Sequence, residues 1–174
     1  MTLGWAHVLL ALVALQRLSE VVYDRRNTRA LMARGGREFG AGHYPVMVVL
    51  HTAWLVAMAV LTAPNPLVLP GWLALFAVCQ VVRVWCVVSL GPYWTTRIVV
   101  LDGAAPVTRG PYRHLRHPNY LIVALEVPAL PMALSLPWVA LVFGILNLLL
   151  LAHRVRVENA ARATLTAHNI GSTA

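Results

Sequence analysis

The polar stretch GPYRHLRHPNY, at residues 110–120, combines basic and aromatic side chains immediately before an apolar segment. Pro118 suits the first turn of a helix, where its missing N–H group is not needed. The backbone amides of Asn119 and Tyr120 then fall in that first turn, whose amides lack partners within the helix. Such amides favour an anionic or electron-rich ligand. The stretch therefore predicts a ligand-binding site at the start of a helix.

A second polar stretch, HRVRVENAAR at residues 153–162, follows the last long apolar segment. Arg154 and Glu158 are four residues apart, so in a helix they share one face. The arginine could bind an acidic oxygen and lower its pKa, while the glutamate could bind an amine. A pair of solvated charges on a terminal helix is the alternative interpretation.

Neither the histidines nor the cysteines form a metal-binding pattern. His114 and His117 are three residues apart, but no third ligand is fixed near them. Cys79 and Cys86 are seven residues apart in one apolar segment, and on one helix that spacing is too long for a disulfide. We therefore predict no metal ion and no redox motif.

The composition is that of a membrane protein. Hydrophobic residues make up 59% of the 174 residues and charged residues only 11%, and the mean hydropathy is +0.69. The 14 basic residues are all arginines, and the net charge is +8. In a chain this apolar, we interpret the arginines as facing an anionic membrane surface. The predicted partner is membrane lipid, and nucleic acid is not expected.

Five apolar stretches approach the roughly 20 residues that a helix needs to cross a bilayer. They predict a single domain over 1–174, an all-α integral membrane protein with about five transmembrane helices and a C-terminal helix. The first stretch has no basic leader or cleavage site, so it is expected to be a span rather than a signal peptide. The fourth contains Pro128 and Pro131 and should be kinked, which a bundle tolerates when neighbouring groups bind the freed carbonyls. The expected spans are 3–23, 44–63, 67–90, 120–136 and 137–152.

The arginines outside these spans alternate along the chain. The loop at 24–43 holds five, the turn at 64–66 none, the loop at 91–119 four, the turn at 135–137 none and the tail three. Short cytoplasmic loops collect arginine and lysine. The alternation therefore predicts an N-terminus outside the cell, with both long loops and the tail in the cytoplasm.

Polar residues inside the expected spans all fall in the cytoplasmic half of the membrane. Charged groups at that depth mark a cavity or a paired site by default. The alternative is that Arg17 pairs with Glu20 and Arg83 with Glu126 only to hold helices together. The remaining members of this layer are His51, Gln80 and Asn147.

The loop before the fourth span contains two short runs, TRIVV at 96–100 and APVTRGPYR at 105–113. They flank Asp102 and Gly103, a dipeptide that favours a turn. The sequence therefore predicts a small hairpin-like loop at the membrane surface.

GPYRHLRHPNY resembles the signature of the isoprenylcysteine carboxyl methyltransferase family of membrane enzymes. That signature reads G-x-Y, a short spacer and R-H-P-x-Y at the start of a span. The family also has an arginine and a glutamate four residues apart after its last span, as Arg154 and Glu158 are here. The two motifs cover the C-terminal half of the chain. The resemblance implies a methyltransferase whose cytoplasmic loop binds S-adenosylmethionine.

The resemblance also implies roles for individual residues. Arg154 and Glu158 are expected to be catalytic, with Arg154 directed at the methyl acceptor and Glu158 also binding the cofactor. This chain has Ala104 where the family usually has histidine, and Arg97 where it usually has glutamine. The expected S-adenosylmethionine-binding residues are Ala104, Ala105, Pro106, Val107, Tyr112, His117, Pro118, Asn119, Tyr120 and Glu158.

The N-terminal half, at residues 16–51, is similar to small bacterial members of the family that are encoded beside type III polyketide synthases. This similarity implies a bacterial plasma-membrane protein and a lipophilic acceptor, the hydroxyl of an alkylpyrone or alkylresorcinol lipid. Carboxyl methylation of a prenylcysteine-like substrate and phospholipid N-methylation are alternatives within related enzymes. The five spans are also compatible with a reductase that uses a nicotinamide cofactor, as membrane sterol reductases do, and with a non-enzymatic helical scaffold.

Overall fold

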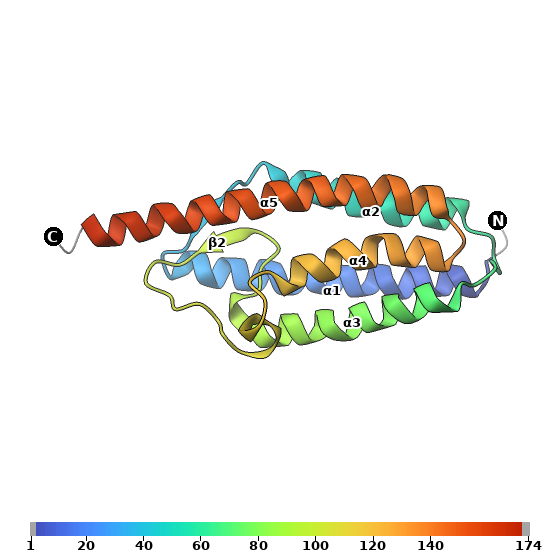
Figure 1. Cartoon of the computed structure of the whole chain (residues 1–174), viewed down its shortest axis with the longest axis horizontal. Coiled ribbons are helices and arrows are strands. Elements are labelled where there is room, and N and C mark those ends of the chain that lie inside the picture. Colours follow the sequence, from blue (N-terminus) through green and yellow to red (C-terminus); the bar gives the residue numbers. More distant parts are fainter. Residues whose placement is uncertain (1–2, 172–174) are drawn as a thin grey trace.

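The computed structural model describes residues 3–171, apart from the side chains of Arg162 and residues 164–171. Arg162, the last arginine of the predicted cytoplasmic tail, therefore lies outside the described side chains. Five helices form a bundle, with two short strands and two 3-10 turns at one end (Figure 1). The elements are α1 (Trp5–Ala33), β1 (Arg37–Phe39), α2 (His43–Leu61), α3 (Pro70–Leu90), η1 (Gly91–Tyr93), β2 (Ile98–Val100), η2 (Gly110–Arg113), α4 (Pro118–Ala133) and α5 (Pro137–Gly171).

Successive helices run antiparallel, so the two termini lie at opposite ends of the molecule (Figure 1). The segments 34–42 and 91–117 therefore share one end with the C-terminal part of α5. We call this the loop end. It gathers the two arginine-rich loops and the arginine-rich tail, as the alternation of arginines predicted. The predicted all-α fold class is confirmed.

Four helices, α1, α2, α3 and α5, are long and apolar enough to cross a membrane. Large apolar side chains on them are exposed, such as Leu15 on α1, Val81 on α3 and Leu149 on α5. Without a lipid solvent, so many exposed apolar side chains would be unfavourable. The chain is therefore an integral membrane protein.

Helix α4 differs from the other four. Its 16 residues span about 24 Å, less than the hydrocarbon core of about 30 Å. Nine of the 16 are buried, against three of the 19 residues of α2. The fourth expected span is thus a helix, but a short and largely buried one, packed between α3 and α5.

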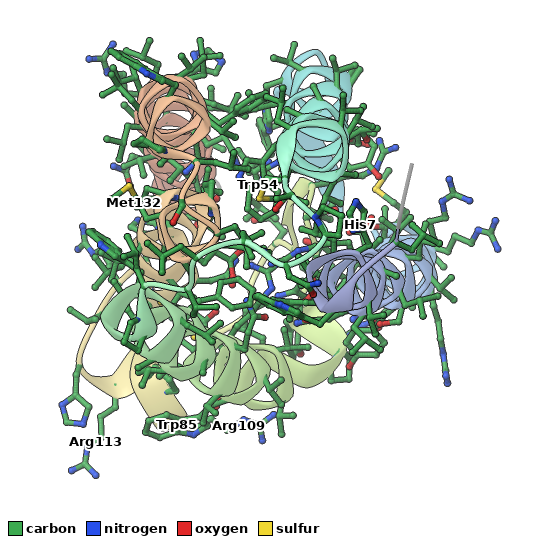
Figure 2. All side chains as sticks on the ribbon, turned by 90° about the vertical axis from the view of Figure 1, so that its right-hand side faces the viewer. His7, Trp54, Trp85, Arg109, Arg113 and Met132 are labelled. Atoms are coloured by element: carbon green, nitrogen blue, oxygen red, sulfur yellow. The ribbon has the colours of Figure 1, made fainter. Side chains whose placement is uncertain are left out.

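The freed carbonyl expected in the proline-containing helix has a partner. Pro131 has no N–H group to donate to the carbonyl of Val127, four residues earlier. The indole Nε1 of Trp54, on α2, donates to that carbonyl oxygen at 3.0 Å. Trp54 is 1% exposed, and it lies in the interior of the bundle between α2 and α4 (Figure 2). This contact joins α2 to α4.

Replacing Trp54 by phenylalanine should lower the free energy of unfolding by about 1–3 kcal/mol, because the Val127 carbonyl becomes a buried, unpaired acceptor. Equilibrium unfolding in detergent measures the change. The matched control is Trp138→Phe, since Trp138 is 76% exposed and its loss should change the free energy by less than about 0.5 kcal/mol. Equal effects of the two substitutions would contradict the role of the indole hydrogen bond.

The predicted hairpin within the second loop is wrong. Strand β2 pairs antiparallel with β1, from the α1–α2 connection, with Glu38 opposite Val99. The run that was expected to pair with β2 contains Pro106 and Pro111, and proline cannot donate to a strand ladder. Asp24 of α1 also holds the loop, because its Oδ1 accepts a hydrogen bond from the Thr96 amide at 2.7 Å.

The charged residues inside the membrane form a closed network, which we call the charge quartet: Arg17, Glu20, Arg83 and Glu126. Arg17 contacts Glu20 at 3.0 Å and Glu126 at 2.7 Å. Arg83 contacts Glu20 at 2.6 Å and Glu126 at 3.0 Å. Both expected pairs are present, and each arginine also binds the other glutamate. The quartet is electrically neutral and links α1, α3 and α4.

Candidate active site

A cavity of about 310 Å³ opens at the loop end, among the 91–117 loop, the start of α4 and α5. This volume is near the lower end of the roughly 300–1,000 Å³ typical of small-ligand sites. The structure brings nine of the ten expected cofactor-binding residues to its walls; Pro118 is buried beside them but does not line the cavity. The nine are Ala104, Ala105, Pro106, Val107, Tyr112, His117, Asn119, Tyr120 and Glu158.

The 91–117 loop packs closely against α3, where its backbone at Gly110 approaches the side chain of Ser89. Gly110 has a φ of 58°, which favours glycine. A Cβ added there would overlap the Ser89 hydroxyl. Arg109 Nε also donates to the Ser89 carbonyl oxygen at 2.7 Å. The glycine that begins GPYRHLRHPNY therefore allows the loop to lie against α3 and form one side of the cavity.

One end of the cavity is polar. The Tyr120 hydroxyl donates to Glu158 Oε2 at 2.8 Å, and His117 Nδ1 lies 3.7 Å from the same oxygen. The His117 and Tyr120 rings are stacked, with centroids 5.3 Å apart. Asn119 Oδ1 is buried with no hydrogen-bond partner among the described residues. These acceptors suit the amine and hydroxyl groups of a small polar ligand.

The remaining walls are mainly apolar and suit a flat aromatic group. Val99, Leu101 and Val107 line this part, together with backbone groups of residues 104–107. Tyr112 stands between the cavity and α3. Burial, followed by the neighbouring Cys86 thiol, raises the pKa of Tyr112, so its hydroxyl stays protonated over the physiological pH range.

Arg154 is buried behind the polar end, at 4% exposure. Its Nη2 donates to the Thr96 carbonyl at 2.6 Å and lies 3.5 Å from the Tyr120 hydroxyl. Its Nη1 lies 3.2 Å from the sulfur of Met47. Among the residues the structure describes, no carboxylate lies within ion-pair distance of Arg154. The interpretation of Arg154 and Glu158 as a pair of solvated charges is therefore wrong, because Arg154 is buried and the two flank Tyr120.

Other residues of the site gave little signal in the sequence. Asp24 and Asn27 are buried on α1, and Asn27 Nδ2 donates to the Trp94 carbonyl at 2.8 Å. In the sequence, the one indication that they act together was their spacing of three residues, which places both side chains on one face of a helix. Thr96 and Met47 come from segments with no polar motif, so only packing reveals that they contact Arg154.

The pattern of the isoprenylcysteine carboxyl methyltransferase (ICMT) family matches residues 72–164, more than half of the chain. The chain belongs to this family. An uncharacterized protein of Bacillus subtilis (strain 168), YpbQ, is 36% identical over 160 residues, which cover 88% of this chain and 94% of YpbQ. No solved structure matches the chain significantly.

Membership of the ICMT family gives the chain, rather than the cavity, a chemical class. The family consists of methyltransferases, which generally depend on S-adenosylmethionine. Every expected site residue, from Ala104 to Glu158, falls within the matched range. The roles expected for the individual residues stay predictions.

Proposed function

We propose that the protein is a membrane-embedded, S-adenosylmethionine-dependent O-methyltransferase that acts on the hydroxyl of a lipophilic acceptor of the alkylpyrone or alkylresorcinol type. The observation that carries the proposal is the buried Arg154, which has no carboxylate partner among the described residues and lies beside the polar end of the cavity. A buried, unpaired cation is costly. An acceptor oxygen that develops negative charge would stabilise it.

The cavity residues fit the cofactor. The unpaired Asn119 Oδ1 and the Glu158 carboxylate can accept hydrogen bonds from its amine and hydroxyl groups, and the apolar wall at Val99 and Leu101 suits its base. When bound, S-adenosylmethionine supplies a methyl group attached to a positively charged sulfur. The protein then has to align donor and acceptor and exclude water, because positive charge disappears in the transfer.

A carboxylate acceptor, as in a prenylcysteine, is the second candidate. The same unpaired Arg154 would bind a carboxylate at least as well as a phenolic oxygen. A phospholipid amine fits less well, because an amine acceptor places positive charge beside a buried guanidinium. The arginine-rich loop end is proposed to face the cytoplasm of a bacterium, where the soluble cofactor is made.

Ligand-dependent stabilisation tests the proposed cofactor. S-adenosylhomocysteine at about 100 times its dissociation constant should stabilise the detergent-solubilised protein by about 2.7 kcal/mol, whereas a nicotinamide dinucleotide should have no effect. The reverse result would contradict a transferase and favour a reductase. Mass spectrometry of lipid extracts from cells with and without the protein should then show acceptor lipids one methylene unit heavier.

A further inference from the structure

His43, the first residue of α2, is an unused buried imidazole at the loop end. The residue is only 7% exposed. Both ring nitrogens are buried and have no hydrogen-bond partner among the described residues. Most buried side-chain nitrogens are paired, because loss of water is otherwise uncompensated. His43 therefore carries two unpaired ring nitrogens inside the protein at the loop end.

The position of the His43 ring is fixed by the turn before α2. Gly40 has a φ of 62°, and a Cβ added there would lie 2.7 Å from His43 Nδ1 and 2.8 Å from a methyl carbon of Val157. The His153 ring packs edge-on, with centroids 6.0 Å apart. The ring is thus held between this turn and helix α5.

The same contact between α2 and α5 places His43 beside Arg154. Arg154 contacts Met47, one helical turn beyond His43 on α2, while Val157, beside the His43 ring, follows Arg154 by nearly one turn on α5. The charged and titratable groups acting on the ring are Arg154 and His153 of α5 and Glu38 of β1. Thr96, whose carbonyl binds Arg154, has a buried hydroxyl with no partner among the described residues.

We infer that His43, Arg154 and Thr96 form the headgroup site for an acceptor that arrives as a neutral, weakly acidic hydroxyl, and that His43 takes its proton. The inference rests on the proposed methyltransferase function. The acceptor O–H bond breaks and its proton passes to a ring nitrogen of His43. The acceptor oxygen forms a bond to the methyl carbon, and the bond from that carbon to sulfur breaks with its electron pair left on sulfur. His43 then returns the proton to water at the loop end.

This role distinguishes the two acceptor classes. A carboxylate is already ionised at neutral pH, so it needs Arg154 but no proton acceptor. A phenolic hydroxyl is largely protonated at neutral pH, and its methylation is accelerated by a base within hydrogen-bond reach. A neutral imidazole beside a guanidinium can remove the proton and leave the oxyanion bound to the cation. The pairing of His43 with Arg154 therefore selects a hydroxyl.

The test uses the full-length protein in lipid nanodiscs with an alkylresorcinol as the hydroxyl acceptor and a prenylcysteine as the carboxylate acceptor. His43→Gln keeps a polar side chain that cannot take the proton. It should reduce kcat for the alkylresorcinol at pH 7 by about 10²–10⁴-fold. The residual rate should rise with pH, because the acceptor then ionises in solution. Binding of S-adenosylhomocysteine, measured by calorimetry, should not change.

The control is His7→Gln. His7 also has a buried, unpaired ring nitrogen, but it lies in the first turn of α1, which begins at the end of the bundle opposite the loop end (Figure 1). Its replacement should therefore leave kcat and the pH profile unchanged. His43→Asn provides a second variant if His43→Gln lowers the unfolding temperature.

Each outcome has a separate meaning. Turnover of the alkylresorcinol by a folded His43 variant, with the wild-type kcat and pH profile, would overturn the role of His43 and leave the proposed function intact. Turnover of the prenylcysteine alone by the wild type would overturn both the hydroxyl headgroup site and the proposed hydroxyl acceptor, and would favour the carboxylate candidate. No methylation of either acceptor by the wild type would count against the proposed function itself.

Discussion

Replacing Arg83 by methionine should lower the free energy of unfolding by about 3–5 kcal/mol, because removing one partner leaves uncompensated charge in a buried ion network. Arg83 contacts both Glu20 and Glu126, and Glu126 is only 1% exposed. After the substitution, two carboxylates share the single cation of Arg17. Unfolding in mixed micelles, titrated with a denaturing detergent, measures the loss.

Two further variants test whether buried charge or lost packing causes the lower free energy of unfolding. In Arg83→Met combined with Glu126→Gln, the network is again neutral, so much of the lost stability should return. Arg97→Met removes an ion pair with Glu38 in which the Arg97 side chain is 32% exposed, and it should cost no more than about 1 kcal/mol. If the double variant is no more stable than Arg83→Met alone, lost packing rather than charge imbalance explains the effect.

Glu158→Ala and Arg154→Ala should separate cofactor binding from turnover. Glu158 lines the cavity and accepts a hydrogen bond from Tyr120, so its removal should cost a charge-assisted contact and weaken S-adenosylhomocysteine binding by about 10–100-fold. Arg154 does not line the cavity. Its removal should leave that binding unchanged and lower kcat by about 10²–10³-fold, as loss of an oxyanion-binding group does. Calorimetry and single-turnover methylation measure the two quantities.

Arg156→Ala is the matched control for Arg154→Ala. Arg156 lies on α5 between the two residues but is exposed, so its replacement removes the same charge without touching the site. It should change neither binding nor turnover. Full activity of Arg154→Ala would remove Arg154 from the acceptor site, and unchanged binding by Glu158→Ala would remove Glu158 from the cofactor site.

The five helices could be predicted from apolar length alone, but their ends could not. The first and fifth spans were expected to end near residues 23 and 152, with a C-terminal helix after the fifth, whereas α1 continues without a break to Ala33 and α5 to Gly171. Hydropathy predicts where a chain leaves the lipid bilayer, not where its helix ends. Arginine and alanine, which are frequent in both extensions, favour helix and allow it to continue into water.

The contacts of the charge quartet could be predicted from the sequence only in part. Arg17 and Glu20 are three residues apart on one helix, so their contact follows from helical geometry. The contacts of Glu126 with both Arg17 and Arg83 depend on how α4 is rotated against α1 and α3. That rotation results from packing of the whole bundle, and no local pattern specifies it.

The candidate site was predictable where one continuous segment supplies it. Residues of the 104–120 segment and Glu158 of α5 line one cavity because the segment leads into α4 and α5 packs against α4. His43, Met47 and Thr96 come from elsewhere in the chain and carried no recognisable spacing. The predicted hairpin was wrong for a local reason. Pro106 and Pro111 have no N–H group to donate to a strand ladder, and both prolines were already visible in the sequence.

Helix α5 is continuous over 35 residues, about 53 Å, and carries both Arg154 and Glu158. A single unbroken helix is mechanically stiff, so the distance between the two groups cannot vary through a hinge. In the proposed enzyme, the spacing of these two groups is therefore the same with and without bound substrates.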